Sequence, residues 1–219
     1  MKNSFKGINF VVPFMLIVSI FSFIVPNIPG IENGNLFFIL LVSSVILVFP
    51  LIQCFLRYLY LKKHFNKHNY LFDLKLAESK FFQRIIYYLL IFTVLIFPII
   101  GTSLNFDNLT YFNIIVIIIS IFASELLLYI SFNKTKFYFY KDKILIFGID
   151  LRLNFPIGNT LNSRSGVYHY GEFKYFRQKN NTVTLFLTEN DSLKMHLPDN
   201  LKKQITNYLI DQGINYKKR

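Results

Sequence analysis

The sequence predicts a two-part protein: an α-helical membrane region with four transmembrane helices, followed by an all-β domain closed by one helix. Three observations indicate this fold class. Apolar residues make up 53% of the 219 residues and lie in long blocks with few charges. The 24 Lys and Arg residues gather in three segments around these blocks. After residue 133 the blocks give way to short segments in which apolar and polar residues alternate, as they do in β-strands.

Four apolar blocks are long enough to cross a membrane. A helix rises 1.5 Å per residue, so about 20 apolar residues span the ~30 Å hydrocarbon core of a bilayer. A segment inside lipid is helical because a helix satisfies its own backbone without water. The blocks contain a single charge, Glu125. They predict transmembrane helices at about 8–28, 35–56, 85–104 and 110–132.

The distribution of Lys and Arg predicts the orientation of these helices, because cytoplasmic loops are enriched in basic residues. The amino-terminal tail carries Lys2 and Lys6, the loop at 57–84 carries seven basic residues, and the segment after Asn133 carries the other fifteen. The two loops between them carry none. We therefore expect a protein of the bacterial inner or cytoplasmic membrane, with both termini and the basic loop 57–84 in the cytoplasm.

Residues 134–219 predict a separate cytoplasmic domain of about six strands and one helix. The segments KFYFY and KILIFGI flank Lys141 and Asp142, and TVTLFLT and SLKMHL flank residues 189–191, which indicates two hairpins. The last segment changes to a helical period and predicts an amphipathic helix at about 199–212, with Pro198 before it and Gly213 after it. Its apolar stripe consists of Leu201, Ile205, Tyr208 and Leu209.

This order of hairpins and one terminal helix resembles the bacterial pleckstrin-homology-like (PH-like) domain. The resemblance depends on YKDKILI at 140–146, NFPI at 154–157, TVTLFL at 182–187 and LKMHL at 193–197. The chain departs from the family at 158–166, where a polar stretch replaces a hydrophobic strand. Members of the family are commonly fused to membrane helices, and some are linked to self-protection against leaderless bacteriocins. The resemblance thus implies a binding or scaffolding role, in envelope protection or bacteriocin self-immunity.

Glu125 is the candidate functional acid inside the membrane. It lies about six residues, or ~9 Å, from the cytoplasmic end of the fourth predicted span. An ionisable group at that depth suggests a proton or ion relay, as in a small transporter or an accessory subunit of a transport complex. The structural alternative is an ion pair with Arg57 or Arg84, and we favour it because one acid without polar partners makes a poor conduction path.

The basic loop 57–84 mixes cations with Tyr, Phe and Leu, as in a segment that lies along an anionic leaflet. Each basic charge near such a surface contributes about 1 kcal/mol. The same charges also serve to set the topology, and both roles can hold together. The expected partners are the lipid bilayer, anionic lipid headgroups and a membrane-protein partner, but no nucleic acid, because no nucleic-acid motif accompanies the charge. The candidate anionic-lipid contacts are Lys62, Lys63, Lys67, Lys75 and Lys80.

No catalytic or metal-binding motif is recognisable. His64 and His68 have the i, i+4 spacing of metal ligands, but three lysines surround them and no partner carboxylate follows, so we expect no metal and no cofactor. The single Cys54 excludes a disulfide within the chain. We therefore expect a non-enzymatic multi-pass membrane protein that displays a cytoplasmic PH-like binding or scaffolding domain, with transport through Glu125 as the alternative.

Overall fold

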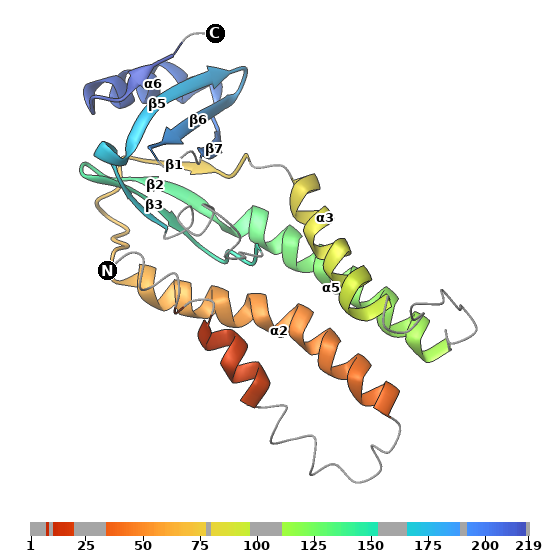
Figure 1. The fold of residues 1–219 in the computed structure, drawn as a ribbon. Helices are drawn as coiled ribbons and strands as arrows, with labels where there is room; N and C mark the ends of the chain where they lie inside the picture. Colours follow the sequence, from red (N-terminus) through yellow and green to blue (C-terminus); the bar gives the residue numbers. More distant parts are fainter. Residues whose placement is uncertain are drawn as a thin grey trace.

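The computed structural model describes residues 8, 11–19, 34–77, 80–96, 111–152, 166–188 and 192–217. It has a helical region and a β-unit, and the helices extend away from one side of the β-unit (Figure 1). The helical region includes a short helical segment at 11–19. Its longer members are α2 (Gly34–Lys62), α3 (Lys80–Ile91), which a π-helical turn at Phe92–Ile96 continues, and α5 (Tyr111–Lys134).

The β-unit consists of two four-stranded sheets and one helix. The first sheet has the order β1-β2-β3-β4 and is antiparallel throughout. The second has the order β7-β6-β5-β8, in which only β8 runs parallel to its neighbour. The strands are β1 (Phe72–Lys75), β2 (Lys136–Phe139), β3 (Lys143–Phe147), β4 (Val167–His169), β5 (Phe173–Lys179), β6 (Thr182–Leu187), β7 (Ser192–His196) and β8 (Asn215–Tyr216). The helix is α6 (Lys202–Asp211), which follows a 3-10 turn at Asp199–Leu201.

Alternating burial explains why these segments form sheets. In β6, Val183, Leu185 and Leu187 are buried while the residues between them are half-buried, which is the period of a strand with one face on a core. The inner faces of both sheets and the apolar stripe of α6 share one continuous core. The tyrosines of α6 and of the turn before β5 add polar links, since Tyr170 and Tyr208 both donate to the backbone carbonyl of Tyr140, at 2.7 and 2.9 Å. The hairpin predicted around Lys141 and Asp142 is confirmed, because β2 pairs antiparallel with β3.

One strand of the β-unit comes from the basic loop between the helices. β1 precedes α3 and α5 in the chain, yet it pairs with β2, in a register that places Phe72 opposite Phe139 and Lys75 opposite Lys136. Just beyond β1, Leu76 forms a bridge to Met195 on β7, so this segment also contacts the second sheet. The segment with α3 and α5 is therefore inserted between two neighbouring strands of one sheet.

The prediction of a bundle of four transmembrane helices is wrong. Within the described part of the chain, one helix has the length and hydropathy to cross a membrane, Ile114–Lys134 in α5. The predicted span at 8–28 is described only at residue 8 and as a helical segment at 11–19, and the rest lies outside the described residues. The predicted span at 85–104 overlaps an α-helix that begins at Lys80 and ends at Ile91, before the π-helical turn.

The physical reason is that a block without charges does not mark where a helix begins, ends or packs. α2 runs six residues past the predicted end at 56, and its last turns contain the buried polar side chains of Gln53 and Arg57. These turns pack against the first sheet, where Leu61 is buried with Leu145 and Val167. Part of an apolar block therefore supplies contacts to the β-unit.

Candidate functional site

The most unusual cluster lies where the helical region meets the β-unit. Two arginines and one aspartate are almost completely buried there: Arg57 is 3% exposed, Asp150 4% and Arg152 1%. Arg57 lies on α2, whereas Asp150 and Arg152 lie in the segment that follows β3. Charged side chains are seldom buried to this degree unless they are paired. We call these three residues, together with Ser131 of α5, the junction.

Asp150 is the shared acceptor of the junction. Arg152 donates to it through Nε at 2.6 Å and through Nη2 at 2.7 Å, which is a bidentate arrangement. Arg57 donates to it through Nη1. The hydroxyl of Ser131 donates a longer hydrogen bond, at 3.4 Å, to the carboxylate oxygen that Arg57 does not contact. The same hydroxyl accepts a hydrogen bond from the backbone N–H of Leu151 at 3.1 Å. α2, α5 and the end of β3 therefore converge on a single carboxylate.

A further hydrogen bond ties α3 to the same place. The hydroxyl of Tyr87, a fully buried side chain on α3, donates to the carbonyl of Leu151 at 2.8 Å. Every described helix longer than ten residues in the helical region thus makes at least one hydrogen bond to the segment after β3. This segment consequently couples the position of the helices to that of the first sheet.

The junction holds two cations and one anion, so its charge is not balanced among these three side chains. In the described structure, Nε and Nη2 of Arg57 are buried and have no hydrogen-bond partner. Buried charge pairs contribute little net stability, but breaking one leaves an uncompensated charge at a cost of about 3–5 kcal/mol. The arrangement therefore fixes geometry more than it adds stability, because the carboxylate of Asp150 accepts hydrogen bonds from α2, from α5 and from Arg152 at the same place.

Glu125 belongs to a different contact, between α3 and α5. Arg84 donates to its carboxylate through Nε at 3.0 Å and Nη2 at 2.7 Å, and the hydroxyl of Tyr88 donates to the other oxygen. The structure thus places Arg84 beside Glu125, whereas Arg57 pairs with Asp150. Glu125 therefore forms the ion pair that was the structural alternative to a relay, and its partner is Arg84 on the neighbouring helix α3.

The candidate lipid-binding lysines are spread over several elements. Lys62 ends α2, Lys63 and Lys67 follow it, and Lys75 ends β1. All four side chains are exposed. Lys80 begins α3, and its side chain lies outside the described ones. Lys63 lies 4.7 Å from the ring centroid of Tyr60. The loop is therefore partly folded into the β-unit through β1, and its described lysines are exposed.

His64 stands among cations, which does not suit a metal site. Burial lowers its pKa, and the nearby charges of Lys143, Lys63 and His169 lower it further. Its ring lies against Tyr60, at 5.4 Å between centroids, and the backbone of Asn66 exchanges hydrogen bonds with the Tyr140 hydroxyl. Among the described side chains, no three His, Cys, Asp or Glu residues come close enough to hold a metal ion.

Sequence reasoning missed Asp150, Arg152 and the strand β1. An acid and a base two residues apart after an apolar strand, as in GIDLR, were the available signal for the junction. For β1 the signal was the alternation of Phe72, Leu74 and Leu76 with polar residues inside a basic loop. Both signals are short, and their partners are distant in the sequence.

Comparison with known proteins adds no relative. No protein-family model matches the chain, and neither the curated proteins nor the solved structures contain a significant match. The function is therefore inferred from the geometry of this chain alone.

Proposed function

We propose that this protein is a non-enzymatic, membrane-anchored scaffold that displays its β-unit as a binding module at the cytoplasmic face of a bacterial membrane. In this proposal α5 crosses the bilayer, and α2 and α3 flank it. The β-unit holds a partner at the membrane, in envelope protection or bacteriocin self-immunity. The junction keeps the module in a defined orientation on the helices.

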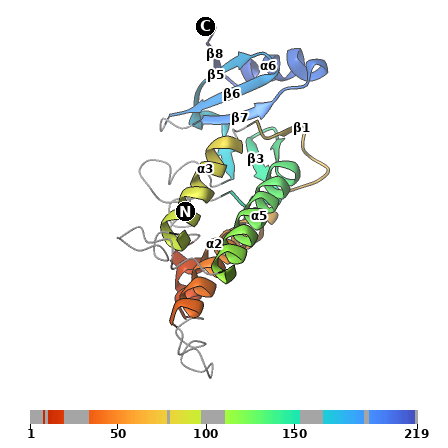
Figure 2. The same cartoon turned by 90° about the vertical axis from the view of Figure 1, so that its right-hand side faces the viewer.

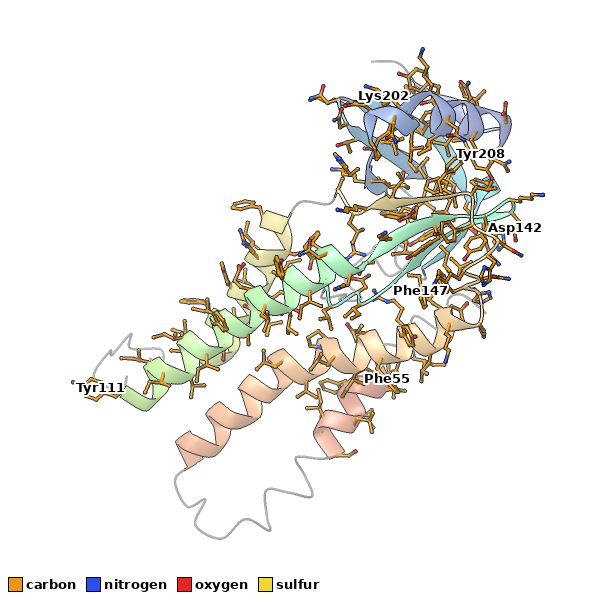
Figure 3. All side chains as sticks on the ribbon, turned by 180° about the vertical axis from the view of Figure 1, so that it is seen from behind. Phe55, Tyr111, Asp142, Phe147, Lys202 and Tyr208 are labelled. Carbon is orange, nitrogen blue, oxygen red and sulfur yellow. The ribbon has the colours of Figure 1, made fainter. Side chains whose placement is uncertain are left out.

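The observation that most directly supports this proposal is the exposure of large apolar side chains on the helices. Ile118 and Phe122 on α5 are 59% and 70% exposed, and α2 and α3 also present exposed Leu, Phe and Tyr side chains. Soluble monomers rarely expose apolar patches of this extent, and such patches mark membrane or protein contacts. The side chains of Figure 3 extend outward along the whole length of α5, from Tyr111 upward. A lipid environment would satisfy this surface.

The polar side chains of α5 support the same reading. Ser120, Ser124 and Ser131 are buried. The hydroxyls of Ser120 and Ser124 donate to carbonyls of their own helix, at 2.8 Å each. Apolar residues outside and small polar residues at helix contacts are the arrangement expected of a helix in lipid.

A PH-like identity of the β-unit is part of the proposal. It is supported by the consecutive order of β1 to β4 in one sheet, the hairpin-connected β5, β6 and β7 in the other, and one helix after the last of them. In this chain the segment with α3 and α5 would then be an insertion between the first and second strands. That arrangement explains why a binding module and an anchor share one folding unit.

Fractionation of the full chain after expression in a bacterium tests the anchor. We expect the protein in the membrane pellet, resistant to extraction at alkaline pH, and a fluorescent protein fused to its carboxyl terminus should fluoresce, as cytoplasmic fusions do. Recovery of the full chain in the soluble fraction would contradict the proposal. A membrane-bound but dark fusion, with a periplasmic reporter active at the same position, would contradict the cytoplasmic display.

A further inference from the structure

The second sheet turns a regular set of polar side chains away from the core. Since the buried residues of β6 and β7 face inward, their alternate residues face outward, and the register aligns these with β5. The result is three cross-strand rows, which we call the basic face. The rows are Lys179–Thr182–His196, Arg177–Thr184–Lys194 and Tyr175–Phe186–Ser192.

The basic face carries charge of one sign. β5, β6, β7 and β8 contain no Asp or Glu over their described residues. Lys179 and Lys194 are exposed, and so is Lys217, which follows β8 and lies 5.1 Å from the ring centroid of Tyr175. A surface without counter-charges attracts anions and repels cations.

The aromatic row indicates what kind of anion fits. Tyr175 and Phe186 stack on each other with 4.5 Å between ring centroids. The guanidinium of Arg177 lies 5.4 Å from both centroids. Nucleobases bind single-strand platforms by stacking on free aromatic faces. Here the rings are covered by each other and by cations, so the face offers charge and hydroxyls more than stacking area.

The basic face lies on the side of the β-unit from which the helices extend. In Figure 1, α6 lies to the left of β5–β7, and α3 leaves the β-unit below them on the right. Figure 2, seen from that right-hand side, shows β5, β6 and β7 broadside, above α3 and α5. Because α6 covers the inner face of this sheet, the opposite face is the one turned toward the side of α3 and α5.

The geometry points to a second membrane contact: the basic face docks on anionic lipid headgroups of the leaflet below it. This inference rests on the proposed function, since the anchored helices present the face to the membrane. It involves residues other than the loop lysines between α2 and α3. A cation near an anionic leaflet strengthens attachment by about fivefold, so three exposed lysines suffice to hold the β-unit down.

Lysine labelling of the full chain tests the contact. The protein is placed in lipid nanodiscs of phosphatidylcholine, with or without phosphatidylglycerol, and acetylated with a water-soluble reagent before mass spectrometry. We expect Lys179, Lys194 and Lys217 to react more slowly in the anionic discs, on the order of fivefold. Raising the salt to about 1 M, where the screening length is ~3 Å, should abolish the difference. Lys141, Lys202 and Lys203 are internal controls whose rates should not change.

A matched pair of triple variants tests whether the three lysines cause the docking. The readout is energy transfer from a dye at the carboxyl terminus to labelled headgroups, which should rise in the anionic discs for the unaltered chain. Lys179→Gln/Lys194→Gln/Lys217→Gln should lose this rise. Lys141→Gln/Lys202→Gln/Lys203→Gln, with the same change in charge, should keep it.

The outcomes separate this inference from the proposed function. A chain that enters neutral discs but labels equally in both lipids overturns the docking and leaves the anchor intact. A chain that does not enter neutral discs overturns both. Protection of the three lysines by a single-stranded oligonucleotide, without protection by anionic lipid, would make the basic face a nucleic-acid surface and overturn the inference.

Discussion

In the β-unit, Phe137, Ile144 and Phe176 are completely buried, whereas on α5 Ile118 and Phe122 expose more than half of their side chains. The polar residues show the reverse arrangement. Ser120 and Ser124 of α5 are buried, while most outward side chains of the second sheet are polar, Phe186 being the apolar one. The β-unit thus keeps its large apolar side chains inside, whereas α5 exposes them, although both are built from the same apolar residue types.

In the proposed membrane setting, the two regions depend on different forces. Burial of apolar surface stabilises the β-unit, whereas helices in lipid are held together by packing and polar contacts. The junction lies between the two regions and is polar: a carboxylate shared by Arg57 and Arg152, with Ser131 beside it. Four substitutions test this comparison.

The largest effect is expected at the junction. Asp150→Asn keeps the shape of the side chain but removes the buried negative charge that Arg57 and Arg152 share, at a cost of about 3–5 kcal/mol. The measurement is the unfolding of the full chain in mild detergent, followed by circular dichroism. If this variant is no less stable than Asp73→Asn, which breaks a half-buried ion pair within the β-unit, the junction does not join the two regions.

A new charge should act oppositely in the two regions. Ile118→Lys places a cation on the exposed face of α5, at a cost of up to about 2.5–3.5 kcal/mol for insertion into lipid. Ile210→Lys makes the same change at an exposed site on α6 and should leave membrane association unaltered. The fraction of each variant in the membrane pellet measures the difference. Equal fractions would remove the distinction between the two surfaces.

A smaller effect is expected where β3 passes the start of β2. Gly148 has φ +137°, and a Cβ there would lie 2.1 Å from the carbonyl oxygen of Lys134, at the end of α5. Gly148→Ala should therefore destabilise the fold, by about 1–3 kcal/mol from the backbone conformation and by more from the overlap. Gly171→Ala is the control, because nothing lies within 4 Å of the added carbon. Thermal midpoints that fall equally for both would show that the close approach is unimportant.

The smallest effect is expected at the half-buried ion pair of Lys136 and Asp73 between β1 and β2. Its hydrogen bond to Asp73 raises the pKa of Lys136 above the ordinary value. The stabilisation is therefore complete below the unfolded pKa of about 10.4 and is lost as the pH rises through the higher folded pKa. Asp73→Asn should reduce stability by less than about 1 kcal/mol at neutral pH. Denaturation curves should show the same free energy of unfolding for the variant and the unaltered chain above that folded pKa. A difference that persists there would exclude the ion pair as its cause.

Local patterns in the sequence predicted what local geometry controls. The hairpin around Lys141 and the helix near the carboxyl terminus follow from periods of two and 3.6 residues, and the structure has β2, β3 and α6 at those places. The sequence limited the ion-pair partner of Glu125 to Arg57 or Arg84, and Arg84 forms the pair in the structure. The four-span bundle failed because counting apolar residues ignores where a helix stops and what it packs on.

The separation into long apolar blocks and short alternating segments is visible in the sequence, because each pattern depends on residues close together in the chain. The pairing of Arg57 with Asp150, 93 residues away, and of β1 with a strand beyond α3 and α5 became visible in the folded chain alone. The physical reason is that any buried cation requires some anion, and any edge strand some neighbour, but their identity depends on how the helices and sheets pack.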